Sequence, residues 1–251
     1  MNTKEECLSK VPVVTAIFWI IKIAATTLGE TGGDSVSMSM NLGYLVGTAI
    51  FGVIFIGLVI AQISAKKFQP YLYWLTIIAT TTVGTTLADF ADRSLGIGYA
   101  GGSSLLLVLL LSSLFIWYRT TGSVSVNMVR SPKTEIFYWV TIMFSQTLGT
   151  ALGDWTADTA GLGYTGAAIV FSGLLALIGA AYFWTKIPRT MLFWSAFILT
   201  RPLGAVVGDF LDKPISSGGL ALSRYAASAV LFVFIAVCII FFKQRPADQC
   251  H

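Results

Sequence analysis

The sequence predicts an all-α, polytopic membrane protein whose eight transmembrane helices form four parallel two-helix repeats around a central polar face. Of its 251 residues, 55% are hydrophobic and only 11% are charged. That is too little charge to cover the surface of a soluble domain. The apolar residues form long runs, and a helix of about 20 apolar residues crosses the hydrocarbon core of a bilayer. Because the backbone must satisfy its own hydrogen bonds in lipid, these runs are expected to be helices.

Eight runs have the required length. The expected spans are residues 12–34, 43–64, 71–91, 98–118, 135–155, 163–185, 190–211 and 222–242. The first run carries the repeated motif described below, so we expect it to remain in the protein and not to be a cleaved signal peptide. The chain is expected to be a single membrane domain, residues 1–251, with repeats at about 12–66, 67–121, 132–187 and 188–243.

The repeats are defined by four tryptophans, Trp19, Trp74, Trp139 and Trp194. Ten residues after each tryptophan is a glycine, fourteen after it a small residue, and fifteen after it an aspartate. These aspartates are Asp34, Asp89, Asp154 and Asp209. The pattern needs no gap, which indicates four copies of one unit. Since each unit holds two spans, all copies are expected to enter the membrane in one direction, with the first helices around a centre and the second helices outside.

This repeated pattern of tryptophan, glycine, small residue and aspartate resembles a bacterial family whose members are often labelled membrane-anchored proteins. That family is built from four tandem two-helix transmembrane repeats of unknown function. The resemblance covers essentially the whole chain. It implies an eight-helix membrane fold in the bacterial inner membrane, and it brings no established activity with it.

The basic residues predict the orientation of the chain. Eleven lysines and arginines lie at the termini and between the units, against three in the connections inside the units. This bias predicts that both termini are cytoplasmic. It also accounts for the net charge of +4 without a nucleic-acid partner. The expected partners are the lipid bilayer and a small ion or solute, and the oligomeric state is left open.

One face of each first helix is polar. At about 100° per residue, positions 7, 11, 15 and 18 after the tryptophan fall on the same side of a helix. Small residues at positions 10 and 14 flank this face and predict close approach of neighbouring helices. The candidate residues of a substrate or ion pathway are Glu30, Asp34, Thr85, Asp89, Asp92, Gln146, Thr150, Asp154, Asp158, Arg201, Asp209 and Asp212.

The sequence leaves two interpretations of the repeated aspartates. They could converge in the membrane, where a buried carboxylate needs a partner or a proton. They could instead lie in exposed outer turns, with Arg93 and Lys213 as local counter-ions. Arg201 is expected to pair with Glu30 or an aspartate, the alternative being contact with an anionic substrate. Lys22 is expected to snorkel to the interface, and the tryptophans to form an interfacial aromatic belt.

Carboxylates and hydroxyls without an available histidine or cysteine suit a hard cation. The first hypothesis is therefore a transporter of a divalent metal or of protons, with Asp34, Asp89, Asp154 and Asp209 as the metal ligands. The alternatives are a proton-coupled transporter of a small organic solute bound by Arg201, and an anchoring or assembly protein without transport. No cofactor is expected beyond a bound or transported divalent cation. No nucleophile–base pair points to an enzyme, although the residues leave an intramembrane hydrolase open.

Overall fold

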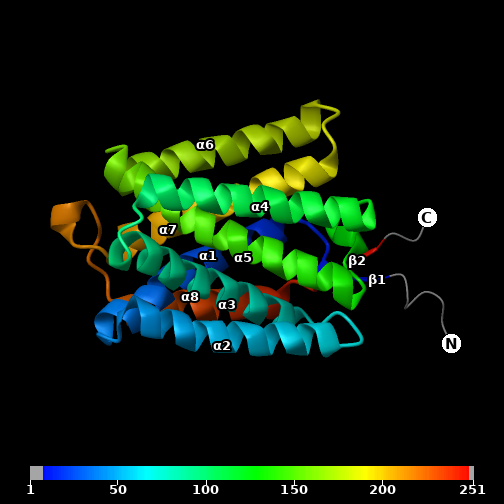
Figure 1. The fold of residues 1–251 in the computed structure, drawn as a ribbon, viewed down its shortest axis with the longest axis horizontal. Coiled ribbons are helices and arrows are strands. Elements are labelled where there is room, and N and C mark those ends of the chain that lie inside the picture. The colour runs from blue at the N-terminus through cyan, green and yellow to red at the C-terminus, as the bar shows by residue number, and fades with distance from the viewer. Residues whose placement is uncertain (1–7, 249–251) are drawn as a thin grey trace.

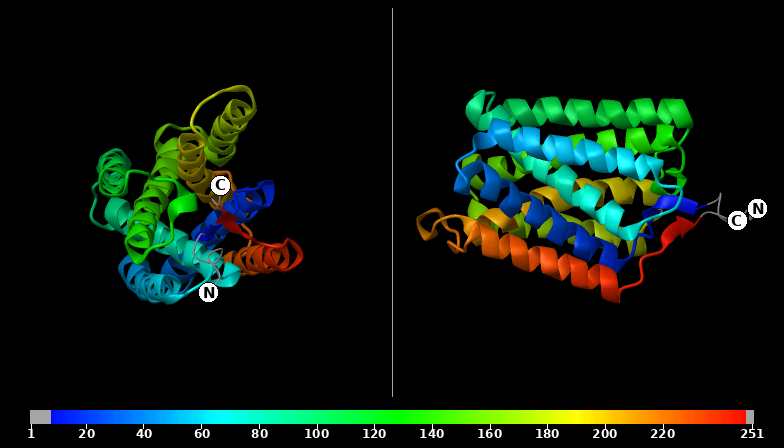
Figure 2. Two further views of the ribbon diagram at one scale, coloured as in Figure 1. Left: turned by 90° about the vertical axis from the view of Figure 1, so that its right-hand side faces the viewer. Right: turned by 90° about the horizontal axis from the view of Figure 1, so that it is seen from below.

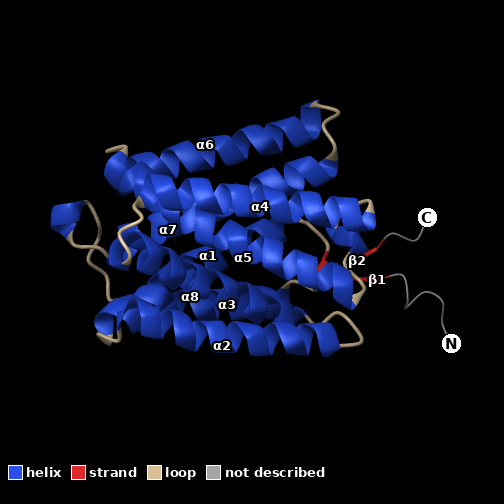
Figure 3. Ribbon diagram, in the orientation of Figure 1, coloured by secondary structure: helices blue, strands red, loops and turns tan. Residues whose placement is uncertain are grey.

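The computed structural model describes residues 8–248 and consists of long helices with one small sheet (Figure 1, Figure 3). The long helices are α1 (Ala16–Asp34), α2 (Gly43–Ser64), α3 (Pro70–Asp89), α4 (Tyr99–Thr121), α5 (Pro132–Asp154), α6 (Gly163–Trp184), α7 (Arg189–Asp212) and α8 (Arg224–Phe241). Each expected span coincides with one of these helices to within a few residues. The all-helical fold class is therefore confirmed, with boundaries that differ from the expected ones by a few residues.

Five of these helices, α2, α4, α6, α7 and α8, are long and apolar enough to cross a membrane. In the most apolar stretch of α2 only 6% of the residues are buried, against 72% in α7. The even-numbered helices thus present apolar side chains on the outside of the molecule. The inner helices α1, α3 and α5 are not among these five. They contain threonines, a glutamine and carboxylates that are buried inside the bundle.

Local signals in the sequence explain where several helices begin. Pro70 and Pro132 stand in the first turns of α3 and α5, where proline's missing amide costs no hydrogen bond. Ser131 and Thr134 form a reciprocal capping box at the start of α5. The repeated glycines at 43, 98 and 163 adopt φ values of +77°, +75° and +63° where α2, α4 and α6 begin, a region that a side chain disfavours.

The repeated aspartate ends the α-helical part of each of the first three copies. A wider π-helical turn follows directly in each: η2 (Ser35–Ser39), η3 (Phe90–Ser94) and η5 (Trp155–Thr159). Such turns rotate the following side chains away from the regular helical face. Two short 3₁₀ turns, η4 (Val126–Met128) and η6 (Ile215–Ser217), complete the helical segments.

The helices α1, α3, α5 and α7 form a closed ring in which each packs against two others: α1 on α3, α3 on α5, α5 on α7 and α7 on α1. The second helix of each copy packs mainly on the first helix of the following copy, α2 on α3, α4 on α5 and α6 on α7. The last helix, α8, packs on α1 and so continues the same pattern around the ring. Figure 2 shows this arrangement from the end of the bundle.

The repeated glycines make the ring tight. A Cβ atom added to any glycine at position 10 would collide with or crowd the position-7 residue of the next copy. These pairs are Gly29 with Thr81, Gly84 with Gln146, Gly149 with Arg201 and Gly204 with Thr26. At position 14, a Cβ on Gly208 would lie 2.7 Å from Cβ of Glu30. The predicted close approach along the small residues is thereby confirmed.

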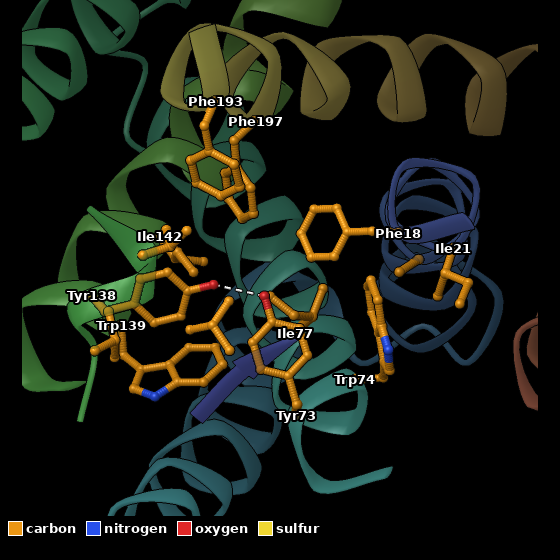
Figure 4. Packing of buried hydrophobic residues seen from close by; sticks show 14 of the residues in the cluster. Phe18, Ile21, Tyr73, Trp74, Ile77, Tyr138, Trp139, Ile142, Phe193 and Phe197 are labelled. Carbon is orange, nitrogen blue, oxygen red and sulfur yellow. Dashed lines mark hydrogen bonds between the residues drawn. The ribbon is translucent and has the colours of Figure 1, made fainter. Parts of the chain in front are cut away.

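An aromatic cluster fills the N-terminal ends of the ring helices (Figure 4). The hydroxyls of Tyr73 and Tyr138 lie 2.6 Å apart in its middle. The expected tryptophan belt is wrong for three of the four copies, because Trp74, Trp139 and Trp194 are only 1%, 2% and 5% exposed. Because the four copies form a ring, each of these indoles contacts the aromatic residue that precedes the tryptophan of the previous copy. The three indoles therefore pack inside the bundle.

A small sheet joins the two ends of the described chain. Strand β1 (Leu8–Pro12) pairs antiparallel with β2 (Pro246–Asp248). Lys10 extends from β1 into the bundle, where its Nζ lies 2.7 Å from Oε1 of Glu135 and donates to the carbonyls of Gln62 and Ile63. No sequence pattern predicts this sheet, and Glu135, the partner of Lys10, is buried.

Candidate functional site

The four repeated aspartates lie inside the bundle at the C-terminal ends of the ring helices. Asp34, Asp89, Asp154 and Asp209 are 1%, 2%, 3% and 3% exposed. The interpretation as exposed outer turns is therefore wrong. Closure of the ring explains this, because each aspartate faces the neighbouring copy instead of the surrounding solvent.

Three of these four carboxylates, those of Asp34, Asp89 and Asp209, converge with other acids. Carboxylate oxygens of Glu30, Asp34 and Asp89 lie within 4.8 Å of one another, and so do those of Asp34, Asp209 and Asp212. Asp34 belongs to both groups and so connects them. Like charges at such distances repel strongly where water is scarce, so this acidic cluster requires cations or protons.

Lys213 supplies one of these cations. Its Nζ lies 2.6 Å from Oδ2 of Asp34 and 3.0 Å from Oδ1 of Asp209, and it therefore joins copy four to copy one. Burial lowers the pKa of Lys213, but the neighbouring carboxylates outweigh it and raise that pKa above its ordinary value. The ammonium is therefore charged throughout the neutral range, and its contribution to stability is lost only when the pH rises through this raised pKa.

Arg93 has the equivalent place on the other side of the ring. Its Nε lies 3.1 Å from Oδ1 of Asp89, and its Nη2 lies 3.3 Å from Oδ2 of Asp154 in the next copy. Burial lowers the pKa of Arg93, and the two aspartates raise it by more. Arg93 and Lys213 both stand nineteen residues after the tryptophan of their copy, so the cation sites alternate around the ring.

Replacing Lys213 with methionine should lower the melting temperature of the protein, because it leaves Asp34 and Asp209 facing each other without their shared cation. Breaking such a buried pair costs about 3–5 kcal/mol, discounted here because the Lys213 side chain is 11% exposed. The measurement is thermal unfolding in detergent at pH 7. The exposed Lys186→Met is the matched control, and equal effects of the two substitutions would contradict the role given to Lys213.

Two further acids belong to this end of the ring. Asp212 accepts a 2.7 Å contact from Nε of Arg224 on α8, which also lies 3.9 Å from Asp34. Asp92, in the turn after α3, is 9% exposed. Burial raises the pKa of its carboxyl above the ordinary value, and the charge of Arg93 offsets only part of this increase. Asp158, the remaining acid on the predicted face, is exposed. The structure does not bring it together with the buried acids, because it lies four residues beyond Asp154 in the π-helical turn η5.

One helical turn deeper lies a buried ion pair. Nη2 of Arg201 is 2.9 Å from Oε2 of Glu30 and 2.5 Å from the hydroxyl oxygens of both Thr85 and Thr150. The hydroxyl of Thr85 also lies 3.2 Å from the Glu30 carboxylate. The predicted pairing of Arg201 with Glu30 is confirmed. The ring thus brings together residues from all four copies, since α7, α1, α3 and α5 each contribute one of these side chains.

In the deepest polar layer, the prediction for Lys22 is wrong. Lys22 does not snorkel to an interface; it is 0% exposed, and its Nζ lies 4.2 Å above the ring of Phe197. Gln146, at the equivalent of position 7 in copy three, is also fully buried. The sequence signal was available, because Lys22 stands one turn before the polar face of its own helix.

The acidic cluster has an excess of negative charge. Its acids are Glu30, Asp34, Asp89, Asp92, Asp154, Asp209 and Asp212, and its bases are Arg93, Arg201, Lys213 and Arg224. Oδ1 atoms of Asp34, Asp92 and Asp212 are buried and accept no hydrogen bond from residues 8–248. Carboxylate oxygens without donors, together with threonine hydroxyls, are the ligands of a hard metal cation or the acceptors of a proton.

Comparisons with known proteins agree with the four-copy architecture. The model of the family described as Repeat of Unknown Function (DUF347) matches residues 17–68, 72–123, 137–187 and 192–245. Neither the curated proteins nor the solved structures that were compared gave a match. Four consecutive matches that together span most of the sequence show that this chain belongs to the DUF347 family of repeats of unknown function.

Proposed function

We propose that this protein is an integral membrane transporter of a hard cation, either a divalent metal ion or a metal ion exchanged for protons. The observation that carries the proposal is the cluster of seven buried carboxylates with only four bases around it. A structural ion-pair network alone would be expected to balance its charges, because an uncompensated buried carboxylate costs several kcal/mol.

In this proposal all eight helices span the membrane as four parallel repeats around a central axis. The inner helices contribute polar side chains and the outer helices the apolar surface. The bias of basic residues towards the connections between the units places both termini on the cytoplasmic side. The acidic cluster then lies towards the outer side of the bacterial inner membrane.

The bases suggest how a cation is bound and released. Lys213 and Arg93 each bridge two aspartates of neighbouring copies, and they occupy the positions that a metal ion would take. A divalent cation that enters between Asp34, Asp89 and Glu30, or between Asp34, Asp209 and Asp212, displaces these contacts or protons. Uptake of the cation and loss of protons or ion pairs are thereby linked.

The ion pair of Glu30 with Arg201 forms the next station, and the aromatic cluster closes the other end. Tyr73 of α3 and Tyr138 of the neighbouring α5 meet there, and Val11 of β1 packs in the same cluster. Passage of an ion therefore requires the N-terminal ends of the ring helices to move apart. Coupling of that movement to the occupancy of the acidic cluster would provide alternating access.

The alternative of an organic solute held by Arg201 is weaker. The guanidinium already contacts one carboxylate and two hydroxyls through a single nitrogen, Nη2. An arginine engaged in this way is a fixed counter-ion for Glu30 and has less of its charge available to a large anionic substrate.

Cation flux into proteoliposomes tests the proposal. Wild-type protein should carry at least one of Mg²⁺, Mn²⁺ and Ca²⁺, or protons, down an imposed gradient. Asp34→Asn should lower that flux about tenfold or more, which corresponds to a loss of about 1.4 kcal/mol in binding or in the barrier. Asp34 is the right target because it belongs to both groups of carboxylates.

The exposed Asp158→Asn is the matched control and should leave the flux unchanged. A second variant, Asp89→Asn, guards against a folding defect specific to Asp34. Both variants must elute as the wild type does in gel filtration before flux is compared. The proposal is wrong if the wild type carries none of these cations, or if both buried aspartates can be replaced without loss of flux.

A further inference from the structure

The deepest polar layer of the ring holds two buried basic side chains with unpartnered donors. Lys22 on α1 and Arg201 on α7 are both 0% exposed. Nζ of Lys22, and Nε and Nη1 of Arg201, have no hydrogen-bond partner anywhere in residues 8–248. Unpaired buried donors on charged groups are costly, so this arrangement points to a ligand that accepts hydrogen bonds.

The two bases lie on neighbouring helices that pack tightly. Nζ of Lys22 lies over the ring of Phe197, which is one helical turn before Arg201. One turn after Lys22, the hydroxyl of Thr26 donates to the carbonyl of Thr200, the residue before Arg201. Lys22 and Arg201 are therefore held within about one turn of each other along the facing sides of α1 and α7.

A third buried polar group lies on α5, which packs against α7. Gln146 is fully buried, and neither its Nε2 nor its Oε1 finds a partner within the described part of the chain. Gln146 and Arg201 occupy the same position of adjacent copies, seven residues after the tryptophan. Its amide adds two donors to this layer, whereas Ile77 and Ile142, the equivalents of Lys22 in copies two and three, are apolar.

The charges of this layer do not balance. Glu30 is the only carboxylate that contacts Arg201 among residues 8–248, and Nη2 alone makes that contact. One carboxylate thus faces two basic groups, Lys22 and Arg201. A second, mobile negative charge would neutralise the layer and satisfy the remaining donors together.

We propose that Lys22, Arg201 and Gln146 form a binding site for one small monovalent anion of the size of a halide. A small anion is indicated because the layer is enclosed by Phe197 and the isoleucines and faces the ion pair of Glu30. Arginine and lysine provide charge-assisted hydrogen bonds, and the amide of Gln146 provides a neutral one. This site does not depend on the cation transport proposed above.

A cavity on the side of the bundle reaches the chain neighbours of the two bases. A cavity of about 300 Å³ lies elsewhere against α2 and α5, but the larger one, about 680 Å³, lies between α1, α6 and α7. The larger cavity is lined by Ile23 and Thr200, the chain neighbours of Lys22 and Arg201. Arg189 and Asn127 also line it, and their polar groups would favour an anion there.

Bromide binding to the purified full-length protein in detergent tests the site. Equilibrium dialysis with bromide, at constant ionic strength maintained with gluconate, should show a single saturable bromide per chain. The melting temperature should rise with bromide concentration and reach a plateau, because a ligand that binds only the folded state stabilises it. Gluconate is too large to enter and should have no such effect.

The substitution Lys22→Met should abolish saturable bromide binding and the rise in melting temperature. Since methionine replaces a buried cation with a side chain of similar length, folding should be retained. Gln146→Leu serves as a second, uncharged variant and should weaken bromide binding about tenfold, the effect of one lost hydrogen bond of about 1.4 kcal/mol. Lys186→Met, at an exposed position, is the control and should bind bromide as the wild type does.

Three results would overturn the proposal: no saturable bromide binding by the wild type, unchanged binding by Lys22→Met, or equal loss in the Lys186→Met control. The first two would mean that Lys22 is neutral in the bundle and needs no counter-ion. The bromide test is independent of the cation-transport proposal. Asp34→Asn removes a carboxylate of the acidic cluster and leaves Lys22 and Gln146 in place. That variant should bind bromide normally.

Discussion

Gly204→Ala is expected to lower the melting temperature of the protein markedly, although it adds only one methyl group. The new Cβ would lie 2.9 Å from the backbone carbonyl carbon of Thr26 and even closer to the Thr26 side chain. Because backbone atoms stand in the way, α1 and α7 must move apart to accommodate it. Overpacking of this kind costs about 1–3 kcal/mol, and each kcal/mol corresponds to about 2–4 °C in a chain of this size.

The position of Gly204 in the ring makes this effect important. It is the contact at which copy four packs on copy one, so it closes the ring. Gly173→Ala in α6 is the matched control, because no atom lies within 4 Å of the Cβ that it would add. Alanine favours a helix over glycine by about 1 kcal/mol, so Gly173→Ala should leave the melting temperature unchanged or raise it. Equal changes in the two variants would contradict the packing role of Gly204.

Glu30→Gln and Arg201→Gln are expected to destabilise the protein strongly when made singly and far less than additively when combined. Each single change leaves one buried charge without its 2.9 Å partner, which costs about 3–5 kcal/mol. The double variant places two neutral amides where the ions were, and these can bond to each other and to Thr85 and Thr150. A double-mutant cycle from thermal unfolding in detergent measures the coupling.

Additive effects of the two substitutions would show that Glu30 and Arg201 do not depend on each other. The cycle has an internal check in Thr150→Val, which removes one 2.5 Å contact of Arg201 but leaves both charges paired. Its cost should be about 1–3 kcal/mol, the effect of an unsatisfied buried donor. The ion pair is thereby separated from the hydroxyl contacts around it.

The acidic cluster has a two-fold pattern inside its four-fold repeat. Copies two and four carry an aspartate at position 18 (Asp92, Asp212) and a base at position 19 (Arg93, Lys213). Each base bridges its own repeated aspartate to that of the next copy. From the sequence, both bases were expected to be local counter-ions of a single acid. Helical spacing predicts contacts only between residues of the same helix.

The repeat pattern by itself determined the helices and their polar faces. Periodic glycines and aspartates, long apolar runs and basic connections depend on local chemistry, and a pattern repeated four times makes them readable without structure. The pairing of Arg201 with Glu30 was also predictable, since a buried guanidinium must find a carboxylate and few are available at that depth.

Only the tertiary structure decided how the copies meet. Ring closure buried the repeated aspartates, turned three of the four repeat tryptophans inwards and enclosed Lys22, because each copy is covered by the next. The π-helical turn moved Asp158 outwards, and the terminal strands paired across the length of the chain. Burial and charge pairing between distant copies are properties of the closed ring. The sequence of a single helix does not determine which surface will pack against it.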